Sequence, residues 1–204
     1  MLTLYHAPKS RSSAIVTLLD ELGALDQTDI RIVDIPRMMT GTGAPDPANP
    51  HPEKKVPLLI HNGTAIRERG AIILYLTDLF PKAGLGRPIN DSARGSYLSW
   101  LFYYHAVMEP VFVTGFAGLS HPMLMSAFRD TAAVTARLTE ALSASPYLLG
   151  NSFSAADLLV HSPFAWAPQM MPDVPVIRDW VARCADRPAA RRTAEYDSEK
   201  LAMA

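Results

Sequence analysis

The chain has little cysteine and almost no net charge, and both deficits restrict its chemistry. Cys184 is the one cysteine in 204 residues, so an intramolecular disulfide, a Cys-x-x-Cys redox centre and a cysteine-rich zinc site are excluded. The net charge of −1 lacks the basic excess that nucleic-acid binding usually shows. The N-terminus lacks the charged and apolar regions of a signal peptide. We therefore expect a cytoplasmic protein that does not bind nucleic acid.

The chain also lacks a clean membrane-spanning segment. Residues 97–119 are long and apolar enough to resemble one, but His105, Glu109 and Pro110 lie near its centre. Each of these residues is costly in lipid, which favours a buried helix and no membrane association. What the chain does have is 49% hydrophobic and 19% charged residues, the composition of a globular protein with a real core.

The first 80 residues mix strand and helix patterns. Asn62-Gly63 separates two apolar runs and is a strong signal for a two-residue hairpin turn. Five prolines and two glycines in residues 36–52 predict a long irregular loop, and loops of that length are often functional. The expected elements are strands at 2–5 and 30–35, a helix at 12–23, hairpin strands at 56–61 and 64–66, and a helix at 68–80.

The pattern changes after residue 80. Residues 81–90 hold two prolines and two glycines and read as a linker, and no convincing strand follows Asp91. We therefore predict an α/β domain over 1–80 and an all-helical domain over 91–204. The expected helices of the second domain are 92–118, 123–145, 154–168, 175–185 and 187–197.

Hydroxyl residues stand at the start of the first helix. The loop after the first strand contains Pro8, and Ser10, Ser12 and Ser13 follow it. Serines in this position either cap free backbone N–H groups or present a hydroxyl to an anion bound at the positive helix end. The segment alone leaves both interpretations open.

Three further segments carry recognisable patterns. Lys55-Val56-Pro57-Leu58-Leu59 begins a strand just after a proline, and Glu68-Arg69-Gly70-Ala71-Ile72 begins a helix with an acid. Ser154 and Asp157, in the segment 149–157, have the spacing of a helix capping box, so Asp157 is expected to support the fold. With the element order, these segments resemble the cytosolic glutathione transferase family, in particular bacterial members with a serine-type first loop. The resemblance implies a thioredoxin-like domain with a mixed four-stranded sheet, followed by an all-helical domain.

The resemblance also implies a site for glutathione as co-substrate, with no metal. Pro57 would be cis, and the backbone of Val56 would pair with the cysteinyl part of the tripeptide. Glu68 and the helix N-terminus would hold the γ-glutamyl end. Arg69 stands where the family usually has serine; it could clamp a carboxylate, fill the pocket or point to solvent. Residues assigned to glutathione binding are Arg11, Lys55, Val56, Pro57, Glu68 and Arg69.

The family's chemistry needs a thiolate, and several groups could stabilise it. A free thiol has a pKa of about 8.5, so a hydroxyl donor beside a helix N-terminus would increase the thiolate fraction. The candidates are Ser10 first, then Ser12 and Tyr5, with the backbone or Arg11 alone as a further alternative. Arg11 occupies the position of the cysteine in the cysteine-type class, which disfavours a mixed-disulfide mechanism. No proton-relay triad is required, and the scattered histidines, His6 among them, show no metal-ligand spacing.

The resemblance leads to a functional prediction with open alternatives. The first hypothesis is a homodimeric glutathione transferase acting in detoxification, which activates glutathione for attack on small apolar electrophiles. The second is a non-catalytic binding or regulatory protein of the same fold, since Arg69 alters the glutathione site. The third is a specialised glutathione-dependent isomerase or dehalogenase. The hydrophobic substrate site is assigned to residues on the long helix: Tyr103, Tyr104, Met108 and Phe112, near Trp100.

Overall fold

A computed structural model describes residues 1–37 and 39–203. It divides the chain into two compact units. Unit 1 contains Met1–Ala83 together with Pro188–Ala204, and unit 2 contains Gly84–Arg187. No helix in the described residues is long and apolar enough to cross a membrane.

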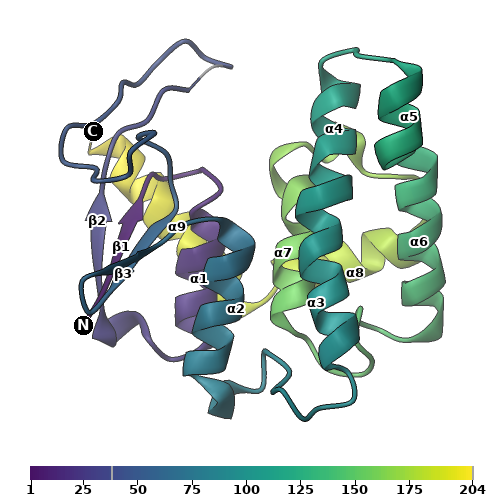
Figure 1. Cartoon of the computed structure of the whole chain (residues 1–204), viewed down its shortest axis with the longest axis horizontal. Coiled ribbons are helices and arrows are strands. Elements are labelled where there is room, and N and C mark those ends of the chain that lie inside the picture. The colour runs from purple at the N-terminus through teal and green to yellow at the C-terminus, as the bar shows by residue number, and fades with distance from the viewer. Residues whose placement is uncertain (38, 204) are drawn as a thin grey trace. The chain divides into compact units, whose positions relative to one another are not determined.

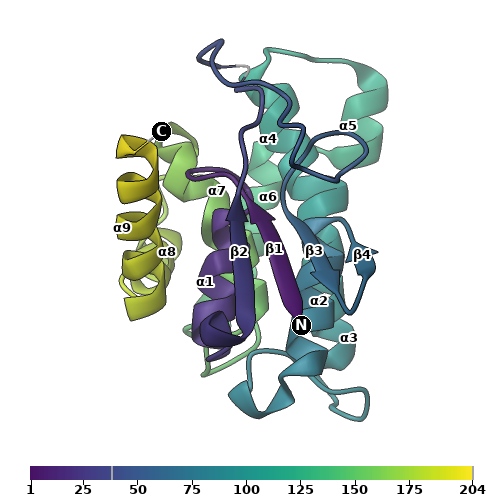
Figure 2. The same cartoon turned by 90° about the vertical axis from the view of Figure 1, so that its left-hand side faces the viewer.

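Unit 1 is built on a four-stranded mixed sheet (Figure 2). Its strands are β1 (Leu2–His6), β2 (Thr28–Ile32), β3 (Leu58–His61) and β4 (Thr64–Ile66), in the order β2-β1-β3-β4. β1 and β2 are parallel, whereas β3 is antiparallel to both β1 and β4. The parallel pair and the antiparallel hairpin confirm the fold predicted from the sequence.

Helices α1 (Ser13–Glu21) and α2 (Arg69–Leu79) lie side by side on one face of this sheet (Figures 1 and 2). The apolar stripe of α1 is buried, with Ile15, Leu18 and Leu19 all at 0% exposure. Burying such a side chain contributes roughly 1.5–3 kcal/mol, so this stripe fixes the helix against the sheet. In the β3–β4 turn Asn62 and Gly63 both have positive φ, as a two-residue hairpin turn requires.

The last helix, α9 (Pro188–Ala202), packs on α1 in unit 1 (Figure 2). This differs from the division drawn from the sequence, which placed every residue after 90 in the helical domain. The residues that α9 buries are Ala189, Thr193 and Asp197, four positions apart, and two of them are polar. Thr193 accepts a 3.0 Å hydrogen bond from Thr17 of α1. A search for apolar periodicity misses such a contact face because its side chains are small or polar.

The segment between β2 and β3 is a long loop, as the prolines predict. Apart from a bridge between Arg37 and Thr42, its described residues contain no strand or helix. The loop is held by polar groups: Asn49 is fully buried, and its side chain donates to the Lys55 carbonyl. The second strand begins two residues earlier than predicted, at Thr28, where the Thr28 hydroxyl donates to the carbonyl of Ala24.

Unit 2 is all helical, as expected. Its α-helices are α3 (Arg94–Tyr103), α4 (Glu109–Phe116), α5 (Pro122–Phe128), α6 (Thr131–Ala144), α7 (Ala155–Trp166) and α8 (Pro175–Ala185). One π-helical turn, Tyr104–Met108, joins α3 to α4 just before Pro110, whose missing N–H disturbs the regular ladder. The single helix predicted at 123–145 is wrong: Arg129 has a φ of 68°, and Asp130 caps a new helix by accepting from the Ala133 amide.

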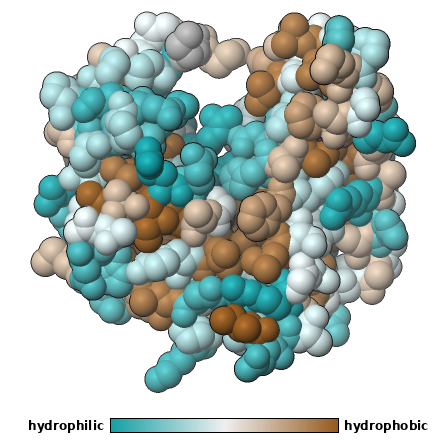
Figure 3. Space-filling view, viewed as in Figure 1, coloured by the Kyte–Doolittle hydropathy of each residue, from teal (hydrophilic) through white to brown (hydrophobic). Residues whose placement is uncertain are grey.

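The capping box predicted in unit 2 is confirmed. Asp157 is fully buried and accepts hydrogen bonds from both the amide and the hydroxyl of Ser154. Its other oxygen accepts from the Leu148 amide and from the Trp180 indole N–H. Elsewhere in unit 2 hydrophobic residues gather at the surface over the α4–α5 end (Figure 3), among them Phe116, Leu119 and Met123.

Candidate functional site

Strand register places three of the predicted binding segments at one edge of the sheet of unit 1. Tyr5 near the end of β1 pairs with Leu58 at the start of β3. The strands are antiparallel, so the Val56–Pro57 segment just before β3 lies opposite His6. Leu59 pairs with Ile66, so Glu68 at the start of α2 reaches the same edge. The loop after β1 and the N-terminus of α1 complete this edge, which brings together residues 6–13, 55–57 and 68–69.

The first loop is organised by hydroxyl groups. The Ser12 Oγ lies 2.8 Å from the Ser10 Oγ and 2.7 Å from the His6 Nδ1, and it accepts the Ala7 amide at 3.1 Å. Ser12 and His6 are fully buried, whereas Ser10 keeps partial exposure. Ser12 also occupies the N-cap position of α1. Of the two serines favoured by the sequence, only Ser10 therefore has a hydroxyl near solvent.

Asp197 of α9 is the other end of this network. Its Oδ1 lies 2.9 Å from the His6 Nε2, and its Oδ2 accepts the Lys9 amide and the Ser13 hydroxyl at 2.7 and 2.6 Å. Burial raises the pKa of Asp197, but the hydrogen bonds from His6, Ser13 and Lys9 outweigh it, and the pKa is lowered overall. The carboxylate is therefore ionised near neutral pH.

Sequence reasoning missed both His6 and Asp197. His6 follows a strand with no metal-ligand spacing, and Asp197 is separated from it by 191 positions. The one local signal was the four-residue spacing of Thr193 and Asp197 on α9, which places a carboxylate on the buried face of that helix.

Tyr5, the third hydroxyl candidate, lies on the other face of β1, because successive residues of a strand point to opposite faces. Its ring packs with Val33 and Leu58, and only 7% of it is exposed. Its hydroxyl accepts a 3.2 Å hydrogen bond from Arg31 of β2. The structure thus separates Tyr5 from the Ser10–Ser12 pair.

The segment before β3 has the predicted backbone. The Val56–Pro57 peptide bond is cis. Lys55 is exposed, and its pKa is raised chiefly by the hydrogen bond and charge of Glu53; Glu68 raises it further, whereas Arg11 lowers it. These effects show that Lys55, Glu68 and Arg11 lie within electrostatic range of one another, at the edge where the register places them.

The start of α2 has an unusual geometry. Glu68 has φ 68° and ψ 121°, a sparsely populated conformation for a residue with a side chain, which costs about 1–3 kcal/mol. Strain of this kind persists where the surrounding structure over-determines it, as at ligand sites. Arg69, the first residue of the helix, is 4% exposed. Of the three interpretations of Arg69, pointing to solvent is therefore excluded, and clamping a carboxylate or filling the pocket remain.

The residues of unit 2 that were assigned to the hydrophobic substrate site differ in their exposure to solvent. Tyr104, Met108 and Phe112 have 0–3% exposure and present almost no surface to a ligand. Tyr103 is partly exposed, and the Arg137 guanidinium lies 3.7 Å from the centroid of its ring. Burial raises the pKa of the Tyr103 hydroxyl, so the phenol stays protonated.

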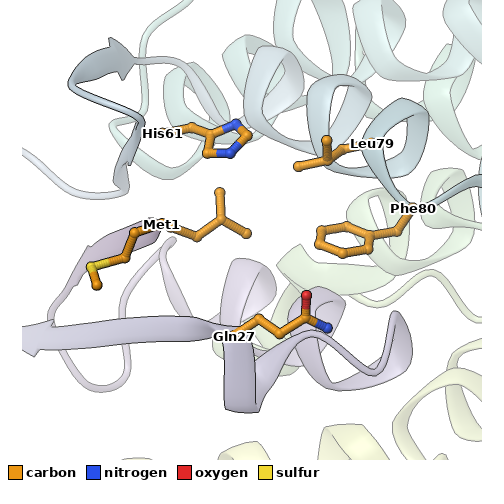
Figure 4. Close-up of a pocket in the computed structure, with 6 residues that line it drawn as sticks. Met1, Gln27, His61, Leu79 and Phe80 are labelled. Atoms are coloured by element: carbon orange, nitrogen blue, oxygen red, sulfur yellow. The ribbon is translucent and has the colours of Figure 1, made fainter.

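Unit 1 also has a pocket at the opposite edge of its sheet (Figure 4). It has a volume of about 220 Å³ and is lined mainly by Met1, Leu2, His61, Leu79 and Phe80. These residues lie at the start of β1, the end of β3 and the end of α2, whereas the polar groups above lie at the other end of each element. The pocket is therefore not part of the candidate site.

Comparisons with known proteins agree with this geometry. The family model of the glutathione S-transferase N-terminal domain matches residues 1–78, and that of the C-terminal domain matches residues 103–188. The chain is 30% identical to glutathione S-transferase GstA of Escherichia coli over 125 residues, 57% of this chain and 59% of that protein. The chain therefore belongs to the glutathione S-transferase family.

Solved structures support the fold. A glutathione transferase from Methylococcus capsulatus matches with a TM-score of 0.77 at 24% identity, covering 97% of this chain and 99% of that one. A sphingomonad glutathione S-transferase, solved in complex with glutathione, matches with a TM-score of 0.73 at 26% identity, covering 96% and 98%. The sheet of unit 1 is thus thioredoxin-like, and the helical unit 2 is the family's C-terminal domain.

Proposed function

We propose that the protein is a glutathione transferase that binds glutathione at the polar edge of unit 1 and activates its thiol. The observation that carries this proposal is the partly exposed Ser10 beside the N-terminus of α1, at the same edge of the sheet as Val56 and Glu68. The sphingomonad relative was solved in complex with glutathione, which supports glutathione as the ligand.

Each group at this edge has a proposed role. The backbone of Val56, beside cis Pro57, pairs with the cysteinyl part of the tripeptide. Glu68 binds the γ-glutamyl ammonium, and the N–H groups at the start of α2 bind its carboxylate. Arg11 and Lys55 supply positive charge for the remaining carboxylate, and both are exposed.

The thiolate is stabilised by Ser10. Each unit by which the thiol pKa falls needs about 1.4 kcal/mol of preferential thiolate stabilisation. A hydroxyl donor and the positive end of α1 together can supply that amount. The buried Ser12 hydroxyl supports Ser10 through the hydrogen bond between them. Tyr5, on the other face of β1, is the less favoured donor to the thiolate.

The thiolate then attacks a small apolar electrophile. Among the substrate-site residues assigned from the sequence, Tyr103 keeps exposed surface and is the proposed contact for the electrophile, whereas Tyr104, Met108 and Phe112 belong to the core of unit 2. The same proposal includes that the protein is a homodimer and that it works in detoxification in the cytoplasm. A specialised isomerase or dehalogenase would use the same thiolate, and a panel of electrophiles separates these reactions.

A second function is favoured by one observation, the burial of Arg69 in place of the family's usual serine. If its side chain fills the γ-glutamyl pocket, the protein is a binding or regulatory member of the family without turnover. If the guanidinium instead clamps the carboxylate, Arg69 strengthens glutathione binding through a charge-assisted pair.

Calorimetric titration of glutathione into wild type, Arg69→Ser and Arg67→Ser tests both functions. Arg67→Ser is the matched control, because it removes an exposed arginine two residues from the buried one. The transferase proposal expects micromolar to low-millimolar binding by wild type, at least tenfold weaker binding by Arg69→Ser because about 1.4 kcal/mol or more is lost, and no change in the control.

The opposite binding results would contradict the transferase proposal. Wild type that does not bind glutathione, together with an Arg69→Ser variant that does, would show that Arg69 closes the pocket. The protein would then be the non-catalytic member of the family. A thermal melt of each variant ensures that a loss of binding is not a loss of folding.

A further inference from the structure

Four side chains form a continuous chain of hydrogen bonds from the surface of unit 1 to its interior. The Ser10 Oγ lies 2.8 Å from the Ser12 Oγ, which lies 2.7 Å from the His6 Nδ1; the His6 Nε2 lies 2.9 Å from the Asp197 Oδ1. The side chains of His6 and Asp197 are 0% and 4% exposed. The chain therefore connects a hydroxyl near solvent to a buried histidine–carboxylate pair.

The direction of these hydrogen bonds follows from the charge at the buried end. Asp197 is ionised, so its Oδ1 can only accept, and the His6 Nε2 must carry the proton that it accepts. With one ring proton on Nε2, Nδ1 is an acceptor. The Ser12 hydroxyl has one proton and two acceptors within reach, Nδ1 at 2.7 Å and the Ala7 carbonyl at 3.3 Å, and the shorter contact to Nδ1 takes it. Ser12 Oγ in turn accepts from the Ser10 hydroxyl and from the Ala7 amide.

This direction leaves the outer end of the chain ready to accept a proton. The Ser10 Oγ accepts the Ser12 amide at 3.2 Å and donates its own proton inward to the Ser12 Oγ. One lone pair of the Ser10 oxygen is left for a further donor. A thiol S–H placed beside Ser10 is such a donor.

We propose that His6, positioned by Asp197, is the internal base that receives the thiol proton of glutathione through Ser10 and Ser12. The thiol proton moves to the Ser10 oxygen, the Ser10 proton to the Ser12 oxygen, and the Ser12 proton to the His6 Nδ1. The S–H bond breaks and an N–H bond forms, so the thiol becomes a thiolate and the imidazole an imidazolium. This assignment rests on the proposed function.

The products of this transfer stabilise each other. After the shift every hydrogen bond of the chain is reversed: Nδ1–H donates to Ser12, Ser12 to Ser10, and Ser10 to the thiolate. The imidazolium is paired with the Asp197 carboxylate, an arrangement in which a buried charge is tolerated. His6 acts through the two hydroxyls and is therefore a positioning and proton-accepting residue.

Few other charged groups face His6 from the elements packed against it. The Tyr196 ring of α9 stacks on the imidazole at a centroid distance of 6.1 Å. Burial, with the charge of Asp197, raises the pKa of the Tyr196 hydroxyl, so the phenol stays neutral. The Lys200 ammonium lies 5.3 Å from the Tyr196 ring centroid. Lys9 and Arg11 lie in the loop after β1, and both are exposed. Asp197 is thus the anion in direct contact with the ring among the described residues.

The test measures where the thiol proton goes. Glutathione is titrated into the full-length protein near neutral pH in two buffers of different ionisation enthalpy, which gives the protons released per glutathione bound. Ultraviolet difference absorbance gives the thiolate formed in the same solutions. If His6 keeps the proton, wild type forms thiolate with release well below one proton for each thiolate.

Ser12→Ala breaks the chain while leaving His6 and Asp197 in place. Its bound thiol can ionise only by losing its proton to solvent, so we expect release to rise to about one proton per thiolate and the thiolate fraction to fall. Asp197→Asn should lower the thiolate fraction as well, because the imidazolium loses its counter-ion. Ser12→Ala carries the test if the Asp197 variant does not fold.

Asp20→Asn is the matched control. Asp20 of α1 forms an ion pair with Arg192 of α9 at 2.8 Å, so it joins the same two helices without touching the hydrogen-bond chain. We expect it to leave both thiolate fraction and proton release unchanged. Equal losses in Asp20→Asn and Asp197→Asn would mean that Asp197 only docks α9, and would overturn the proposal.

Two further results separate this proposal from the function on which it rests. Wild type that binds glutathione, forms thiolate and releases about one proton per thiolate overturns the His6 assignment alone. Wild type that does not bind glutathione overturns both.

Discussion

Asp157 in unit 2 and Asp197 in unit 1 are both buried acids, with 0% and 2% of the whole residue exposed. Asp157 accepts from the Ser154 amide and hydroxyl, the Leu148 amide and the Trp180 indole, none of which titrates near neutral pH. Asp197 accepts from an amide and a hydroxyl as well, but its third partner is the imidazole of His6. The two residues differ in their donors rather than in their burial.

This difference separates a structural carboxylate from one that can take part in chemistry. The hydrogen bonds of Asp157 end in backbone amides, the capping Ser154 hydroxyl and an indole, so they give no route to a ligand and serve to join α7, α8 and the segment before α7. The network of Asp197 continues through His6 and two serines to a partly exposed hydroxyl. Burial of an acid therefore says little about function until its partners are known.

The largest effect should come from removing the structural carboxylate. Asp157→Ala leaves four buried donors without their acceptor, two on Ser154 and one each on Leu148 and Trp180. Because each such group costs about 1–3 kcal/mol, we expect a loss of roughly 3 kcal/mol or more in the free energy of unfolding. Urea denaturation followed by circular dichroism measures it. A loss smaller than that of Asp197→Asn would reverse the comparison.

A smaller effect, dependent on pH, should come from Asp197. Its pKa in the folded protein is lowered below the ordinary 3.8, so its stabilisation is complete above that value and is lost as pH falls through the lowered pKa. Asp197→Asn should cost about 1 kcal/mol near neutral pH, because asparagine keeps one acceptor. Urea denaturation of both proteins over an acidic pH series should show this difference shrinking. A difference that grows with acidity would contradict the assignment.

The smallest effect is expected at the lone cysteine. Cys184 of unit 2 is 1% exposed, and burial, with the charge of Asp157 second, raises the pKa of its thiol. We expect native protein to react with a thiol reagent roughly a thousandfold more slowly than unfolded protein, since labelling requires opening of the unit. Cys184→Ala should leave the glutathione reaction unchanged. Rapid labelling of folded protein would show that unit 2 opens far more readily than its packing implies.

The parts of the fold that depend on short-range patterns could be predicted from the sequence. The Asn62-Gly63 turn, the stripe of α1 and the Ser154–Asp157 capping box each involve residues within a few positions of one another. The predicted helix at 123–145 was wrong because Arg129 adopts a positive φ, and nothing in its residue type favours that conformation. In the candidate site Ser10, Val56 and Glu68 could be proposed from the sequence, because each stands in a recognisable local motif.

The sequence by itself determined the mixed sheet, the helical unit and the serine-bearing first loop, since hydrophobic period, turn residues and caps are local properties of a chain. Only the tertiary structure decided that α9 returns to unit 1 and that Asp197 meets His6. That contact joins residues 191 positions apart through a polar face of a helix, and neither apolar periodicity nor motif spacing records such a pairing. Packing decides which groups meet a buried charge, so the contact between His6 and Asp197 became visible only in the tertiary structure.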